Sequence, residues 1–298
     1  MGKVIREVLD TVWRLALVAV AFTVGVVAGG ILPTLVGLQA PPMPEGTDQM
    51  TVFAYMLLAS VVVALAQSFL ARRLPGRFVV RWGVLAAFTW LLHVAMFVEA
   101  GIFMEGGGTL FTILLYFVPS VFSAATTAAL FRPDGAQKGA FAAAVRRFFS
   151  ARPAGGWAWR LALVWVAFPL IYIGFGLLVV PLTYAFYEGG AYGLTAPAWG
   201  QIIPVQMARS ALLIAASLPV VAAWQGSRRG LWAALGFAVW VLIGLEWMIT
   251  SYWFDPALRI FHSLEVLGDA AVFSGLLVAL VAPGAAAEPA THRASASA

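Results

Sequence analysis

Eight stretches of about 20 apolar residues divide this chain, and they constrain its fold more than any other feature. Hydrophobic residues make up 62% of the chain and charged residues only 10%. A soluble domain carries about 25% charged residues, so a chain this apolar needs lipid rather than water as its solvent. The stretches are approximately residues 15–37, 51–71, 82–104, 109–131, 161–184, 203–224, 231–253 and 261–282.

Each stretch is predicted to be a helix. A lone strand cannot satisfy its backbone hydrogen bonds in lipid, and the alternating segments of about ten residues that build a membrane barrel are absent. We therefore predict an all-α, multi-pass membrane protein with the bilayer as its main partner.

The basic residues predict the orientation of the spans. If the N-terminus is cytoplasmic, sixteen of the eighteen Lys and Arg residues fall in inner segments, and only Arg209 and Arg259 fall on the outer side. Inner loops of membrane proteins are enriched in Lys and Arg, so this asymmetry predicts a cell-membrane protein with both termini in the cytoplasm. The outer loops are short and acidic, with Glu45, Asp48, Glu105, Glu188 and Asp255.

An internal repeat is visible in the sequence. The segment that begins at Trp13 reappears at Trp159, with nine of ten residues identical. Four spans in each unit is an even number, so both units would enter the membrane in the same direction, as a parallel repeat. We predict four-helix repeats at residues 1–131 and 159–283. Later matches keep the same order: Arg72-Arg73 with Arg228-Arg229, and Trp82 and Trp90 with Trp232 and Trp240.

Three segments lie outside this pattern. Residues 132–158 form a cytoplasmic linker, which is either an amphipathic helix on the inner leaflet or a plain solvated connection. The outer loop at 184–197 is rich in glycine and aromatic residues and is either a lid or an interfacial turn. Residues 284–298, rich in Ala, Ser and Pro, are predicted to be a disordered cytoplasmic tail.

Five polar or ionisable residues of the second repeat stand where the first repeat has apolar residues. From their positions along the spans, all five lie in the outer half of the bilayer. A charge that faces lipid there costs about 2.5 kcal/mol or more. They are therefore expected to face the bundle interior and to form a substrate or proton site. His262, Glu265 and Asp269 share one helix face, and Arg209 and Glu246 lie on neighbouring spans.

These charges also have a structural interpretation. Arg209 could form an ion pair with Glu246 or with Asp269 that fixes helix packing. However, one arginine cannot neutralise Glu246, Glu265 and Asp269 together. At least one carboxyl group is therefore expected to bind a proton or a cation.

Three further residues are secondary candidates. His93 lies near the middle of the third span and is expected to be a hydrogen-bonded core residue or a ligand. Glu99 is about one turn from the outer surface and is expected to reach it. Arg259, together with His262, marks the outer interface or borders the site.

Three functions remain open from the sequence. The first is a carrier for a small or lipid-linked solute, with or without coupling to protons. The second is a non-catalytic membrane subunit or sensor whose charges are structural pairs. The third is an intramembrane enzyme acting on a lipid, with Asp269 or Glu265 as general base and His262 as its partner.

Several chemistries are disfavoured. The chain has no cysteine and only three histidines, so neither a thiolate site nor a metal centre is predicted. No phosphate-binding loop or hydrolase motif occurs, and no cofactor is predicted. The basic residues lie between apolar spans rather than on one soluble face, which argues against nucleic-acid binding.

Overall fold

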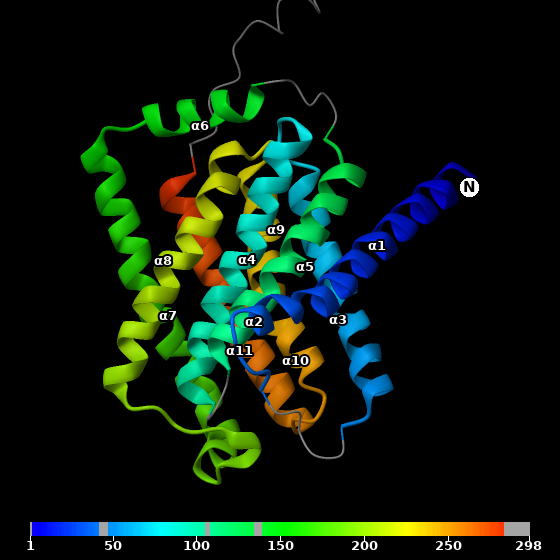
Figure 1. The fold of residues 1–298 in the computed structure, drawn as a ribbon. Coiled ribbons are helices and arrows are strands. Elements are labelled where there is room, and N and C mark those ends of the chain that lie inside the picture. The colour runs from blue at the N-terminus through cyan, green and yellow to red at the C-terminus, as the bar shows by residue number, and fades with distance from the viewer. Residues whose placement is uncertain (1, 42–46, 105–107, 134–138, 283–298) are drawn as a thin grey trace, which may run out of the picture.

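The computed structural model describes residues 2–41, 47–104, 108–133 and 139–282. These residues form a bundle of long helices (Figure 1), with eight candidate membrane spans. The predicted all-α membrane fold with eight spans is confirmed. The helices are α1 (Gly2–Gly29), α2 (Ile31–Leu35), α3 (Gln49–Ala71), α4 (Phe78–Phe103), α5 (Thr109–Leu130), α6 (Ala140–Ser150), α7 (Ala154–Glu188), α8 (Trp199–Ala223), α9 (Arg228–Trp240), α10 (Glu246–Thr250) and α11 (Pro256–Val281).

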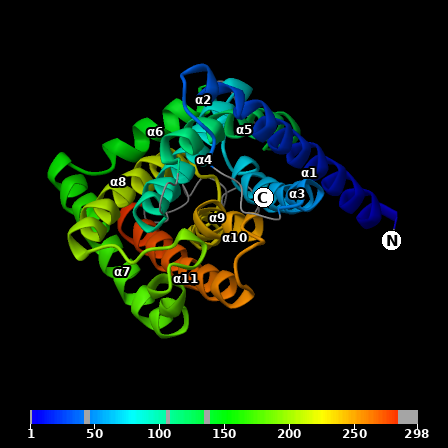
Figure 2. The same ribbon diagram turned by 60° about the horizontal axis from the view of Figure 1, so that its bottom comes forward.

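The helices differ in how deeply they lie in the bundle. Seen from the end opposite α6, α4 and α9 lie inside, while α7 and the N-terminal part of α1 lie at the edge (Figure 2). The seventh span is continuous but not uniform, because a π-helical turn (Val241–Leu245) joins α9 to α10. Gly244 in this turn permits close packing against α11, since a Cβ there would lie only 2.6 Å from Val266 Cγ1.

Side-chain caps begin two of the spans at the end opposite α6. Asp48 accepts a hydrogen bond of 2.8 Å from the backbone N–H of Thr51, and Asp255 caps α11 through Ala257 N–H at 2.7 Å. Hydrogen bonds from the hydroxyl group and then the backbone N–H of Thr51 lower the pKa of Asp48. Pro256 follows at the first position of α11, where its missing N–H costs no helical bond.

The first span of each four packs against the fourth. In the first four, α1 packs on α5, and in the last four, α7 packs on α11. Gly25 and Gly29 bring the backbones of α1 and α5 together, because a Cβ at either position would collide with Pro119 or Leu115. Contacts between the two sets join α4 to α8 and α3 to α9 and α10.

Four tryptophans bind carbonyl groups of a neighbouring helix at matching spacings. Trp82 and Trp232 donate to carbonyls 39 residues further along the chain, at 3.1 and 2.9 Å. Trp90 and Trp240 donate to carbonyls 23 residues further along, at 3.0 and 2.9 Å. The third and fourth spans of each set are therefore joined in the same way.

The linker contains a helix that lies across one end of the bundle. Figure 1 shows α6 running over the ends of the spans, so we refer to this as the α6 end. Phe148 is buried against Trp157, with ring centroids 4.5 Å apart, while Arg146 and Arg147 are exposed. The linker 132–158 therefore contains a helix at Ala140–Ser150, which matches the first of the two alternatives that the sequence left open. The predicted tail 284–298 lies outside the described residues.

Candidate functional site

A cavity of about 360 Å³ lies at the end opposite α6. It is bordered by α4 from the first four spans and by α7, α8, α10 and α11 from the last four. Leu194, Ala196 and Pro197 of the loop after α7 also line it. The wall is mostly apolar or aromatic, and its ionisable groups include Glu99, His262 and Glu265.

Arg209 is buried between α8 and α4. Its Nη1 lies 2.6 Å from Glu99 Oε1 and donates to Gln206 Oε1 at 2.8 Å. Gln206 Nε2 in turn donates to the same Glu99 oxygen at 3.0 Å. The aromatic rings of Phe168 and Tyr172 lie beside the guanidinium group.

This pairing corrects two expectations. The partner of Arg209 is Glu99, rather than Glu246 or Asp269. Glu99 does not reach the surface freely, because only 8% of the residue is exposed. The physical reason is that α4 packs directly against α8, a contact between distant parts of the chain that span order alone does not specify.

The polar stripe on α11 has two parts. His262 Nδ1 lies 3.1 Å from Glu265 Oε2, and both side chains line the cavity. Gly176 on α7 leaves space for this carboxylate, since a Cβ there would lie 3.3 Å from Glu265 Oε1. Asp269 is buried one turn further along α11, and its Oδ1 has no hydrogen-bond partner among the described residues.

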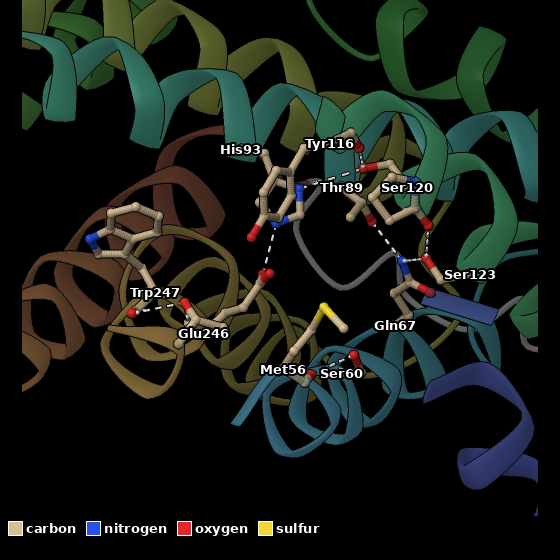
Figure 3. Close-up of polar contacts among 12 residues, drawn as sticks. Met56, Ser60, Gln67, Thr89, His93, Tyr116, Ser120, Ser123, Glu246 and Trp247 are labelled. Carbon is tan, nitrogen blue, oxygen red and sulfur yellow. Dashed lines mark hydrogen bonds and ion pairs between the residues drawn. The ribbon is translucent and has the colours of Figure 1, made fainter. Parts of the chain in front are cut away.

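Glu246 belongs to a different contact from the one expected. Its Oε2 lies 2.7 Å from His93 Nε2, so the pair joins α10 to α4 (Figure 3). The His93 Nδ1 atom lies 3.5 Å from Ser120 Oγ. Both members of the pair are almost fully buried. Glu246 is therefore not a partner of Arg209, and His93 is a hydrogen-bonded core residue that contacts a carboxylate.

A cluster of uncharged polar residues lies next to this pair, toward the α6 end, and was not among the predicted site residues. Gln67 Nε2 donates to Thr89 Oγ1 and to Ser123 Oγ, both at 2.9 Å (Figure 3). Thr127 Oγ1 donates to Gln67 Oε1 at 2.9 Å. We call these four residues the Gln67 cluster. A glutamine inside an apolar span was the one signal in the sequence that could have revealed it.

Arg259 lies away from the ionisable wall of the cavity. Its Nε donates to the carbonyl of Met248 at 2.7 Å, and its guanidinium lies over the ring of Tyr55. It therefore ties the start of α11 to the end of α10.

The described residues include more buried carboxylates than arginines in this region. Glu99, Glu246, Glu265 and Asp269 are buried, whereas Arg209 is the arginine that pairs with one of them. Two histidines supply the other contacts. The other carboxyl groups have no arginine partner among the described residues, and isolated buried charges are costly.

The fold and this site together define a multi-pass membrane protein with a partly polar cavity near one end of its bundle. No protein-family model matches the chain, and neither a curated protein nor a solved structure matches it. No group of three or more acidic or histidine side chains that could hold a metal ion occurs in the described ranges.

Proposed function

We propose that this chain is a membrane carrier for small amphiphilic cations and that its substrate binds in the cavity. The observation that carries the proposal is a cavity bordered by both sets of four spans, with Glu265 and His262 in its wall. A carrier needs such a shared site because the relative movement of two halves can then open it to either side.

The chemistry of the wall supports an amphiphilic cation. Aromatic faces attract cations, and Tyr172, Tyr187 and Trp247 are among the aromatic residues of the wall. Glu265 supplies a carboxylate, and Leu177 and Val180 extend the apolar surface to the lipid-exposed side of α7. An apolar body would lie against these residues while a positive group lies near Glu265.

Two parallel halves fit this proposal. The matching tryptophan bonds support a duplicated origin, as does the packing of the first span on the fourth in both sets. The contacts between the two sets are also related by the repeat. The third span meets the sixth, and their counterparts, the seventh and the second, meet each other as well. We propose a pseudo-two-fold axis along the membrane normal, about which the halves rock.

The distribution of Lys and Arg supports an orientation. It argues for a cytoplasmic α6 end, with α6 on the anionic inner leaflet and both termini inside. The cavity would then face the outer leaflet of the cell membrane.

An intramembrane enzyme that acts on a lipid is the second candidate. The contact between His262 and Glu265 favours it, because an imidazole beside a carboxylate can act as a general base. Against the remaining candidate, a purely structural subunit, stand the cavity and the unpartnered Asp269 Oδ1.

Binding of a probe cation tests the carrier proposal. We expect purified protein to bind radiolabelled tetraphenylphosphonium and to discriminate against tetraphenylborate, an anion of the same shape. Replacement of Glu265 with Gln should weaken binding at least about tenfold, or about 1.4 kcal/mol, because the carboxylate beside the cation is lost. Glu188→Gln is the matched control, since Glu188 is exposed at the end of α7, and it should leave binding unchanged.

Equal binding of the cation and the anion would contradict the proposal, as would equal weakening by the two variants. Conversion of a lipid by the purified protein, lost in His262→Gln, would favour the enzyme.

A further inference from the structure

The contact between His93 and Glu246 joins the third span to the seventh at the centre of the bundle. The two side chains are 1% and 4% exposed. Their 2.7 Å separation requires a proton between Nε2 and Oε2, since two lone pairs would repel each other at this distance. The remaining question is how many protons the pair holds.

The hydrogen bonds of Ser120 indicate how many protons the pair holds. Its hydroxyl group donates to the Tyr116 carbonyl at 2.7 Å, so its oxygen is left to accept from His93 Nδ1 at 3.5 Å. Nδ1 then carries one proton, and the contact between Nε2 and Oε2 needs a second. The 2.7 Å separation lies in the range of a charge-assisted N⁺–H···O⁻ hydrogen bond, so we place both protons on His93.

We infer that His93 and Glu246 form a proton-binding site, held as an imidazolium facing a carboxylate, which supplies the coupling proton of the carrier. The coupling role rests on the proposed function, whereas the proton site does not. Release of this proton would leave a neutral imidazole and a lone carboxylate in an apolar interior, which is unfavourable unless the site opens. Proton release is therefore tied to movement of the two spans.

Among the described residues, no lysine, arginine or further carboxylate forms an ion pair with His93 or Glu246. The helices packed around the pair present Phe22 from α1 and Met56 and Ser60 from α3 (Figure 3). Tyr116 on α5 is a titratable neighbour, and its ring centroid lies 4.6 Å from that of His93. The cation Arg209 on α8 is already paired with Glu99.

The proton site is separate from the cavity. Trp247 lines the cavity and packs against Phe97, whose ring in turn lies beside His93. On the other side the Gln67 cluster begins one turn away, because Thr89 lies four residues before His93. Aromatic residues thus face the cavity, and hydroxyl and amide groups lead toward the α6 end.

The backbone beside Glu246 is suited to a change of position. Glu246 directly follows the π-helical turn Val241–Leu245, and such turns are frequent at functional sites. The carboxylate is held by side chains of other helices, because Oε2 contacts His93 on α4 and the hydroxyl group of Tyr116 on α5 lies beside it.

Histidine ¹⁵N NMR tests the proton site directly, because the chain has only three histidines: His93, His262 and His292. Each signal is assigned by replacing one histidine at a time. We expect the His93 signal to be that of a doubly protonated ring. In Glu246→Gln the same signal should become that of a neutral imidazole, whereas Glu265→Gln should leave it unchanged. A neutral His93 in the unmodified protein would overturn the inference.

The coupling role has a separate readout. In vesicles, His93→Gln should bind tetraphenylphosphonium within about twofold of the unmodified protein but lose uptake driven by a pH gradient. Uptake that persists in this variant would overturn the coupling role. If the unmodified protein does not bind tetraphenylphosphonium, the carrier proposal fails, while the NMR result still decides whether the pair holds a proton.

Discussion

Buried carboxylates in this bundle differ in whether another side chain holds them. Glu99 accepts from Arg209 and Gln206, so its charge is compensated inside the protein. Asp269 Oδ1 has no such partner in the described part of the chain. Removal of the charge should therefore affect the stability of the protein much more at Glu99 than at Asp269, although the chemical change is the same.

Asp269→Asn should leave the protein folded and abolish tetraphenylphosphonium uptake. No bond that holds the fold is lost, so the free energy of unfolding should change by less than about 1 kcal/mol or should rise. Glu99→Gln is the contrast, because it leaves Arg209 buried without its carboxylate and should cost about 3–5 kcal/mol. Thermal unfolding of both variants in the same detergent measures the difference. A strongly destabilised Asp269→Asn protein would indicate a structural role for this residue.

The residue types at the site were largely accessible from the sequence, but their partners were not. Charged residues inside apolar spans are costly, so Arg209 and Glu265 stood out by type and position alone. Whether Arg209 meets Glu99 or Glu246 depends on which helices touch, and these contacts cross between distant spans. Ser123 and Thr127 were missed because a hydroxyl group can satisfy itself on its own helix backbone and is ordinary in a span.

Helix positions followed hydropathy closely, and departures occur where the backbone changes type. The seventh span reads as one apolar stretch, yet a π-helical turn interrupts it. Apolar periodicity carries no signal for such a turn, because all five residues of the turn are themselves apolar or glycine. By contrast, α6 could be anticipated because Phe148 and its basic neighbours share a short segment with one apolar face.

Close packing of α1 on α5 should fail if Gly25 gains a large side chain. Gly25→Leu places atoms where the backbone of Pro119 lies, so the helices must separate and the yield of folded protein should fall several-fold. Gly83→Leu is the matched control, because Gly83 also lies within a spanning helix but has open space beside it. Size-exclusion chromatography of the two variants measures the effect, and equal yields would show that the α1–α5 contact is not needed for folding.

At the scale of the whole molecule, the distribution of arginines predicts which end faces the cytoplasm. Because the chain has no cysteine, single cysteines can be introduced without background labelling. Asp48→Cys and Glu188→Cys should react with an impermeant maleimide on intact cells. Arg147→Cys on α6 should react only after permeabilisation. The reverse pattern would invert the proposed orientation and place the cavity on the cytoplasmic side.

The contact between the first and fourth spans of each set has a consequence for synthesis on the ribosome. The face of α1 that carries Gly25 and Gly29 packs against α5, so it lacks its partner until α5 has been translated and has entered the bilayer. A nascent chain with three inserted spans would therefore carry an incomplete helix interface in the membrane. A chain truncated after α4 would keep this face unpaired, so we expect such a product to be degraded.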